Sequence, residues 1–145
     1  MTILHDLRKG LRTASPEETE ALGEALVADL PENAAIALSG DLGTGKTTLV
    51  RGLARGLGID AAVTSPTYNI YTIYNGNRQL VHMDAYRLTG REALESLTIE
   101  EFLKSPFLIA VEWPENIPGF FEDYPTLRIR LDLMPDRLHE IRLID

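Results

Sequence analysis

Gly40-Asp41-Leu42-Gly43-Thr44-Gly45-Lys46-Thr47-Thr48 is the segment that decides the fold of this chain. It matches the phosphate-loop pattern, in which glycines at fixed spacing precede a lysine and a hydroxyl residue. The glycines allow the backbone to turn so that successive N–H groups face one concave site. Lys46 supplies a positive charge for the β- and γ-phosphates, and the hydroxyl group of Thr47 is a ligand for Mg²⁺. The segment therefore predicts a site for a nucleoside triphosphate with its magnesium ion.

The residues on both sides of this loop provide the context that a phosphate loop requires. Residues 34–39 form a short apolar run, which predicts a buried parallel strand that leads into the loop. Apolar residues then recur at the spacing of one helix face and end before Gly58: Leu49, Val50, Leu53 and Leu57. Strand, glycine-rich loop and helix is the order of the P-loop motif, and the positive end of the helix attracts anions.

Length and composition bound the class of protein. The chain has 145 residues, which is the size of one domain, so we expect a single P-loop ATPase domain over residues 1–145. It has no cysteine, which excludes disulfides and thiolate metal sites. No apolar run approaches the length of a membrane span, and the first residues lack the apolar core of a signal peptide. We therefore expect a cytoplasmic protein.

The net charge of −8 argues against direct binding of nucleic acid through its phosphates, since that mode requires clustered lysine and arginine. Action on RNA through a basic partner remains open. The three histidines, His5, His82 and His139, show no spacing typical of a metal site.

A second candidate site element is Phe107-Leu108-Ile109-Ala110-Val111-Glu112, an apolar strand that ends in an acid. In P-loop proteins such a strand brings a carboxylate to the metal beside the phosphate loop. Glu112 is therefore a predicted Mg²⁺ ligand. Trp113 follows it directly, which indicates a position at the mouth of the site, where an indole reports nucleotide binding. Plain core packing is the alternative for Trp113.

The segment Thr64-Ser65-Pro66-Thr67-Tyr68 predicts a loop, because Pro66 pushes the preceding residue toward extended backbone. Hydroxyl residues after a P-loop helix are typical of a switch segment that responds to the γ-phosphate and Mg²⁺. Thr67 is the candidate for this role. The alternative is that Thr67 caps the following strand.

Two β-prone stretches, 69–74 and 79–84, flank the turn signal Asn75-Gly76-Asn77 and predict an antiparallel hairpin. The hairpin runs into His82-Met83-Asp84-Ala85-Tyr86-Arg87, in which alternate side chains share one face. Asp84 is placed to hold Mg²⁺ through water or to orient an attacking water molecule. A surface cluster of ion pairs is the alternative.

The remaining segments carry helix signals. Ser15-Pro16-Glu17-Glu18 predicts a helix start, with Ser15 as the N-cap and Glu18 completing a capping box. Residues 89–103 predict one or two short helices with five buried apolar side chains: Leu94, Leu97, Ile99, Phe102 and Leu103.

The C-terminal part predicts a loop and a second hairpin. Residues 116–125 form the loop, on which Phe120 and Phe121 make either a flap over the core or a contact with a partner. The alternating pattern of 127–132 and the stretch 138–144 predict two strands. Arg137 lies on the turn between them, where it reaches a phosphate or the adenine, or is solvated.

The fold class that these elements predict is a single α/β domain. It has a P-loop core, a mixed sheet with antiparallel hairpins at 69–84 and 126–144, and helices on both faces. Strand order does not follow from the sequence.

Taken together, the motifs resemble the TsaE (YjeE) family, small bacterial P-loop ATPases required for the threonylcarbamoyladenosine modification of tRNA. The resemblance rests on the phosphate loop, Ser65-Pro66-Thr67-Tyr68, His82-x-Asp84-x-Tyr86-Arg87 and Val111-Glu112-Trp113-Pro114, in this order. It extends from the helix at Ser15 to the last strand. The phosphate loop alone identifies only a superfamily, and the last two motifs make the assignment specific.

The resemblance implies a role for each candidate residue. Thr47 and Glu112 are implied as Mg²⁺ ligands, with Asp84 essential near the metal, and residues 65–68 act as switch I. The implied phosphate ligands are the loop residues Leu42, Gly43, Thr44, Gly45, Lys46, Thr47 and Thr48. Glu115 stands at a position where the family has a nucleotide contact, although members can carry Gln there. Arg137 corresponds only loosely, since the final hairpin varies in length.

The resemblance also implies ATP and Mg²⁺ as cofactors and the TsaB and TsaD proteins as partners. The family hydrolyses ATP slowly alone and docks on the TsaB–TsaD pair, whose TsaD subunit transfers the threonylcarbamoyl group to the adenosine 3′ of the anticodon. ATP turnover is implied to reset that complex, and tRNA is contacted through the partners.

Two other functions fit the loop itself. A small-molecule kinase is one alternative, although the arginine-rich lid of such kinases is not evident in the sequence. A non-catalytic nucleotide-sensing module is the other. A GTPase is disfavoured, because the sequence contains no Asn-Lys-x-Asp element for reading guanine.

Overall fold

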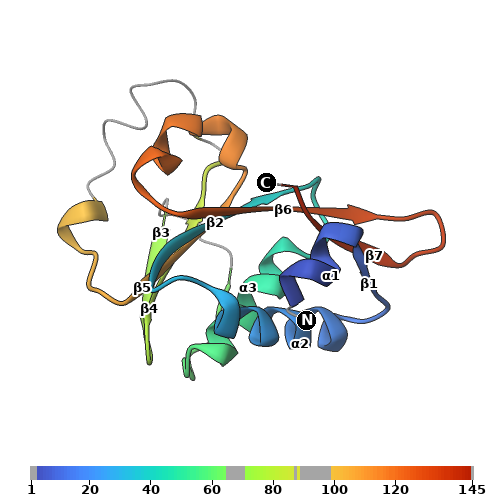
Figure 1. Cartoon of the computed structure of the whole chain (residues 1–145), viewed down its shortest axis with the longest axis horizontal. Helices are drawn as coiled ribbons and strands as arrows, with labels where there is room; N and C mark the ends of the chain where they lie inside the picture. Colours follow the sequence, from blue (N-terminus) through green and yellow to red (C-terminus); the bar gives the residue numbers. More distant parts are fainter. Residues whose placement is uncertain (1–2, 65–70, 87, 89–98, 145) are drawn as a thin grey trace.

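The computed structural model describes residues 3–64, 71–86, 88 and 99–144 (Figure 1). Helices and strands alternate over the first part of the chain in the manner of an α/β protein, and pairs of consecutive strands follow later. Their bounds are α1 Ile3–Lys9, β1 Leu11–Thr13, α2 Pro16–Leu26, η1 Val27–Asp29, β2 Asn33–Ser39, α3 Lys46–Gly56, β3 Tyr71–Asn75, β4 Gln79–Asp84, η2 Ile99–Glu101, β5 Phe107–Glu112, η3 Pro114–Asn116, η4 Pro118–Asp123, β6 Thr126–Leu133 and β7 His139–Leu143, where η marks a 3₁₀ helix.

The described strands form one seven-stranded sheet in the order β1-β7-β6-β2-β5-β4-β3. The central strand β2 is parallel to both β5 and β6, and β4 is parallel to β5. The pairs β3–β4 and β6–β7 are antiparallel, as is β1 with β7. The predicted mixed sheet with two antiparallel hairpins is therefore confirmed.

The parallel strands determine where a site can form. The phosphate loop follows β2, and β5 and β4 lie beside it in that order. The register pairs Leu38 with Glu112 and Glu112 with Asp84, so both acids stand at the same edge of the sheet as the start of the loop. The carboxyl edge of parallel strands is the usual place for ligands in α/β proteins.

The core lies on both faces of the sheet because successive strand residues point to opposite sides. On one face, strand residues such as Ile36, Leu38 and Leu108 pack with α1, α2 and α3. On the other face, their neighbours such as Val81 and Ile109 pack with the 3₁₀ helices and the segment around Ile99. Helices therefore cover both faces as predicted, although the second face carries 3₁₀ helices in the part of the chain that the structure describes.

One detail of the predicted packing differs from the structure, and one alternative is resolved by it. Phe120 and Phe121 are buried against the sheet within η4, so they cover the core and form no exposed contact surface. Phe102 was predicted to be buried but is 47% exposed, because it lies against the edge strand β3. Ile99 is buried as predicted, and Leu103 is partly buried. Leu94 and Leu97 lie outside the described residues.

The helix start at Ser15 is confirmed, with one change in its hydrogen bonds. The Ser15 hydroxyl accepts a hydrogen bond from the Glu18 N–H at 3.2 Å, and Pro16 occupies the first helical position. The Glu18 carboxylate accepts from the N–H of Ala14, one residue before the N-cap, at 2.9 Å. The extended backbone of Ser15 brings the preceding N–H into reach.

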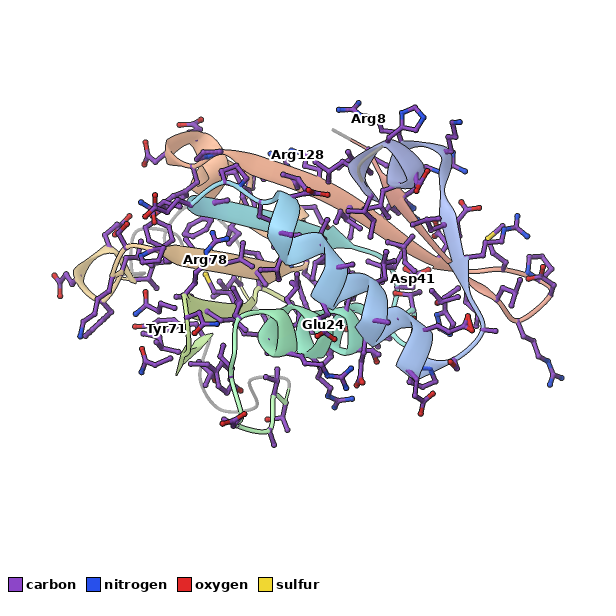
Figure 2. All side chains as sticks on the ribbon, turned by 60° about the horizontal axis from the view of Figure 1, so that its bottom comes forward. Arg8, Glu24, Asp41, Tyr71, Arg78 and Arg128 are labelled. Atoms are coloured by element: carbon purple, nitrogen blue, oxygen red, sulfur yellow. The ribbon has the colours of Figure 1, made fainter. Side chains whose placement is uncertain are left out.

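The helices α2 and α3 lie side by side on the sheet (Figure 2). Gly23 and Gly52 stand at their contact, where a Cβ on Gly52 would overlap the carbonyl oxygen of Glu20. This close approach fixes α3, and with it the phosphate loop, against the N-terminal part of the chain. None of the described helices is long and apolar enough to cross a membrane.

Candidate functional site

The phosphate loop joins the end of β2 to the start of α3, so its backbone N–H groups lie at the N-terminal end of a helix. Gly45 is the N-cap and has a φ of 103°, a value that favours glycine. Gly40 has a φ of 149°, and a Cβ there would overlap the carbonyl oxygen of Leu131 on β6. The loop can therefore follow this path only with glycine at these two positions.

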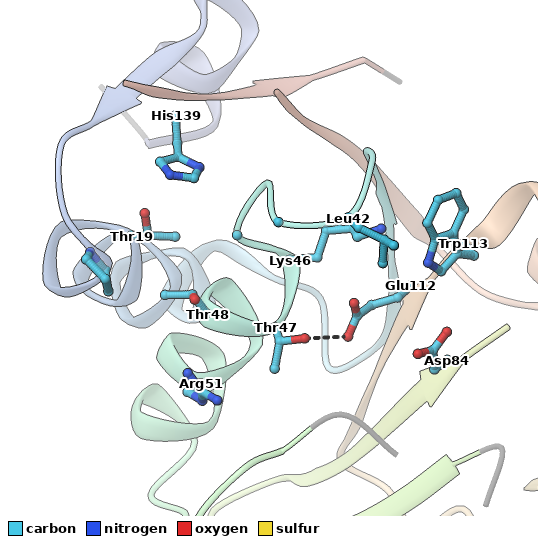
Figure 3. Close-up of a pocket in the computed structure, with 13 residues that line it drawn as sticks. Thr19, Leu42, Lys46, Thr47, Thr48, Arg51, Asp84, Glu112, Trp113 and His139 are labelled. Carbon is cyan, nitrogen blue, oxygen red and sulfur yellow. Dashed lines mark hydrogen bonds between the residues drawn. The ribbon is translucent and has the colours of Figure 1, made fainter. Parts of the chain in front are cut away.

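A cavity of about 420 Å³ opens beside the loop (Figure 3). Its lining combines the loop and α3 with residues from β4, β5, α2 and β7: Pro16, Thr19, Leu42, Gly43, Gly45, Lys46, Thr47, Thr48, Arg51, Asp84, Glu112, Trp113 and His139. Asp84 and Trp113 stand at one end, and Thr19 and His139 stand at the other (Figure 3). The volume falls in the range of small-molecule and cofactor sites.

Thr47 and Glu112 are in direct contact inside this cavity. The Thr47 hydroxyl donates a hydrogen bond to Glu112 Oε2 at 3.1 Å, although the two residues are 65 positions apart in the chain. Glu112 is 4% exposed at the end of β5. The same Oε2 lies 2.6 Å from Nε2 of His82, whose side chain is completely buried on β4.

Asp84 ends β4 directly beside Glu112 in the parallel register. Its side chain is half-buried and faces the cavity (Figure 3). Asp84 Oδ1 accepts a hydrogen bond from the N–H of Tyr86 at 2.9 Å, which holds the carboxylate at the strand end. Two carboxylates therefore stand at one edge of the cavity.

Lys46 is the first residue of α3 and is 4% exposed. Its Nζ donates a hydrogen bond to the carbonyl oxygen of Gly40 at 2.5 Å and lies 3.9 Å from the centroid of the Trp113 ring. Burial lowers the pKa of the Lys46 amine from its ordinary value of 10.5, and the carboxylates of Glu112, Asp84, Glu115 and Asp41 partly oppose this shift. An anion that entered the cavity would favour the protonated amine.

Trp113 stands at the edge of the cavity, which agrees with its predicted position. Its backbone adopts a φ of 59°, which is uncommon outside glycine. Its ring lies 5.0 Å from the ring of Tyr86, which is 54% exposed. The indole therefore bridges Lys46 inside the cavity and an exposed aromatic side chain outside it.

Several predicted site residues lie elsewhere. Thr67 and the rest of the predicted switch segment lie outside the described residues, as does Arg87. Glu115 is exposed on η3, and Arg137 is exposed on the turn between β6 and β7. Both are described, and neither belongs to the lining of the cavity. Glu115 acts on the site through its charge, since it raises the pKa of Lys46.

The structure also brings in residues that the sequence did not single out as ligands. His139 on β7 lines the cavity, and its Nδ1 lies 2.8 Å from the carbonyl oxygen of Thr44 in the phosphate loop. Thr19 on α2 and Arg51 on α3 also line it. The only sequence signal for His82 was its two-residue spacing from Asp84, and His139 had none, because it stands 95 residues from Thr44.

The donor groups of the cavity fit a magnesium nucleotide. Mg²⁺ prefers oxygen ligands and is usually held by one or two carboxylates, with phosphate oxygens and water completing its shell. Thr47 and Glu112 offer a hydroxyl and a carboxylate, and Asp84 offers a second carboxylate nearby. Among the described residues, no cluster of three or more histidine, cysteine or acidic side chains forms a metal site by itself.

Comparisons with known proteins identify relatives across most of the chain. The model of the family TsaE, described as threonylcarbamoyl adenosine biosynthesis protein TsaE, matches residues 13–141. A protein named tRNA threonylcarbamoyladenosine biosynthesis protein TsaE from Treponema pallidum is 35% identical over 127 residues, which cover 88% of this chain and 93% of that protein. Proteins of the same name from Bacillus subtilis and Streptomyces coelicolor are 39% and 42% identical, and the matches cover 83% of this chain in each case and 73% and 84% of those proteins.

A solved structure agrees with these relatives. The crystal structure of YdiB from Bacillus subtilis superposes with a TM-score of 0.72 at 33% sequence identity. The superposition covers 92% of this chain and 82% of that one.

Proposed function

The chain belongs to the TsaE family, as its motifs predict, and from this premise we propose that it is a Mg²⁺-dependent ATPase acting with TsaB and TsaD in tRNA threonylcarbamoyladenosine biosynthesis. One observation carries the proposal. The Thr47 hydroxyl and the Glu112 carboxylate lie 3.1 Å apart beside the phosphate loop, where a metal bound to a nucleotide would need its oxygen ligands.

The phosphate loop supplies the binding energy for ATP. Residues of the loop and of the first turn of α3 line the cavity, and the backbone N–H groups at such a helix start attract phosphates. Lys46 leaves its contacts with Gly40 and Trp113 to reach the β- and γ-phosphates, because the phosphate charge offers its amine a stronger partner than a carbonyl oxygen.

Thr47 and Glu112 would hold Mg²⁺, with Asp84 beside them. When bound, the ion neutralises charge on the phosphates and orients them for an in-line displacement. Asp84 accepts a hydrogen bond from the attacking water and fixes its position. The half-buried position of Asp84 beside Glu112 suits it to hold this water molecule. Catalysis by these residues is mostly positioning and charge neutralisation, as is general for phosphoryl transfer.

A partner completes the catalytic site. Arg51 is the arginine of the cavity lining, and its Nε donates to the carbonyl oxygen of Val63 at 3.0 Å, so part of its guanidinium is already committed. An arginine from the TsaB–TsaD pair, or Arg87 once that pair has docked, would stabilise the charge of the transition state. This division predicts slow ATP hydrolysis by the chain alone. The net charge of −8 suits a subunit that leaves tRNA binding to its partners.

The experiment combines the purified protein with TsaB–TsaD from the same source and measures ATP turnover and tRNA modification. Lys46→Ala should abolish both activities. Arg55→Ala is the matched control, since Arg55 lies on the same helix but forms exposed ion pairs with Glu20 and Glu24 away from the cavity. The control should retain both activities. Equal modification with Lys46→Ala and the wild type would contradict the proposal.

The same assay separates the two alternatives. A small-molecule kinase would transfer phosphate to an added metabolite, whereas we expect release of inorganic phosphate. A non-catalytic sensing module would still support tRNA modification when Glu112→Ala binds ATP but does not hydrolyse it. We expect that variant to fail.

A further inference from the structure

We propose that His82 is a positioning residue that fixes the Glu112 carboxylate for Mg²⁺, an inference that rests on the proposed magnesium–ATP site. His82 has no access to solvent and does not line the cavity. It therefore acts on the site through Glu112. Through Glu112, His82 increases the gain in ATP affinity that Mg²⁺ provides.

The contact between His82 and Glu112 is short, and the same carboxylate oxygen also bonds to Thr47. His82 Nε2 lies 2.6 Å from Glu112 Oε2, and the Thr47 hydroxyl donates to the same oxygen at 3.1 Å. A carboxylate with two donors on one oxygen cannot rotate without losing both hydrogen bonds. His82 therefore keeps Glu112 turned toward Thr47.

The direction of the hydrogen bond follows from its partners. An ionised carboxylate only accepts, so the hydrogen must reside on Nε2 of His82. Nδ1 of the same ring is buried and has no hydrogen-bond partner among the described residues. A buried polar atom without a partner destabilises a fold. A histidine at this position therefore costs stability that an apolar side chain would not, which points to a role in the site.

The sheet explains why these side chains meet. In the parallel register His82 stands beside Ala110, and Asp84 stands beside Glu112. Glu112 and His82 are thus diagonal neighbours on one face, within reach of a long side chain. Glu112 is thus bonded to His82, whereas the Asp84 carboxylate lines the cavity, where it can accept a hydrogen bond from the attacking water.

The test compares His82→Asn with His82→Gln, two neutral amides of which one retains the donor. The amide nitrogen of glutamine reaches the position of Nε2, whereas that of asparagine reaches only the position of Nδ1. The dissociation constant of ATP is measured by Trp113 fluorescence with Mg²⁺ and with EDTA. For His82→Asn, the gain in affinity from Mg²⁺ should fall about tenfold or more, the size of effect seen when such supporting contacts are lost at metal sites.

Affinity in EDTA should stay unchanged in both variants, and His82→Gln should retain most of the gain. A gain equal to wild type in His82→Asn, or an equal loss with and without metal, would overturn the inference. A wild-type protein that shows no Mg²⁺-dependent ATP binding would instead refute the proposed function, so the two failures are distinguishable.

A measurement on the wild type covers the case in which His82→Asn does not fold. Nitrogen-15 NMR of the imidazole reports which ring nitrogen carries hydrogen. A proton on Nε2 of His82 supports the inference. A ring with Nε2 unprotonated would overturn it, since that nitrogen could not donate to the carboxylate.

Discussion

Lys46 is held in place by two contacts within the protein. Its amine lies against the Gly40 carbonyl oxygen and the face of Trp113, and almost none of the side chain is exposed. A cation over an aromatic face in a desolvated site is attracted to it. Binding of ATP must replace these contacts. The change around the indole explains why Trp113 should report nucleotide binding.

An alkaline limit on ATP binding follows from the state of Lys46. Burial lowers its pKa from 10.5, while bound phosphates favour the protonated amine. Affinity should stay constant below the pKa of the free protein and fall as the pH rises through it, beginning below 10.5. Trp113 fluorescence titrations with ATP in EDTA measure this decline without interference from the metal.

Lys46→Arg is the control for that titration, because a guanidinium stays charged throughout the range. The affinity of the Lys46→Arg variant for ATP, whatever its absolute value, should not decline over this pH range. A wild-type affinity that is independent of pH up to 10.5, or an equal decline in both proteins, would contradict the assignment of Lys46.

For individual residues, the sequence predicts part of the site. The phosphate-loop spacing places Lys46 and Thr47 together because they are adjacent in the chain, and the acid-ended strand identifies Glu112. The contact between His82 and Glu112 depends on the register of β4 against β5, and that of His139 with Thr44 depends on where β7 lies. Neither pairing leaves a local signal, so neither could be predicted from spacing.

Among the elements, the pair α2–α3 holds the phosphate loop in place. Gly52 allows the two backbones to approach until a Cβ would overlap the Glu20 carbonyl oxygen. Gly52→Ala should therefore lower the free energy of unfolding by about 2 kcal/mol, since the helices must separate. This loss of stability is larger than the stabilisation of up to about 1 kcal/mol that alanine brings over glycine through its higher helix propensity. The measurement is unfolding in denaturant, in which the dependence of the free energy of unfolding on denaturant concentration should equal that of the wild type.

Arg55→Ala gives the comparison on the same helix. Its ion pairs with Glu20 and Glu24 are exposed, so the variant should lose at most about 1 kcal/mol. If Gly52→Ala were as stable as Arg55→Ala, the close packing of α2 and α3 would not constrain the fold as described.

The elements themselves were largely predictable, and their arrangement was not. Apolar runs and turn signals located β2, β5 and both hairpins within a few residues. Strand order depends on long-range pairing, which the chain does not encode locally. The sequence also left the environment of Phe120 and Phe121 open, because a short 3₁₀ helix has no long apolar period to reveal which side is buried.

For the whole molecule, the site joins elements from opposite ends of the chain. Residues on α2, α3, β4, β5 and β7 line one cavity, so a ligand there links segments that would otherwise separate on unfolding. Mg²⁺–ATP at 100 times its dissociation constant should stabilise the fold by about 2.7 kcal/mol. Thermal unfolding at increasing ATP concentration measures the rise in Tm. In Lys46→Ala the same concentrations should leave the Tm unchanged, and an equal rise would contradict binding at this cavity.

In the proposed site, Thr47 and Glu112 share one magnesium ion with the phosphates of ATP. The most direct measurement is a crystal structure with a non-hydrolysable ATP analogue and Mn²⁺ in place of Mg²⁺, because the anomalous signal of manganese locates the metal independently of the atomic coordinates. We predict a single peak at the phosphate loop, bound to the Thr47 hydroxyl and held by the Glu112 carboxylate directly or through one water molecule. A nucleotide whose metal lies away from both side chains, with Glu112 turned out of the cavity, would contradict the account.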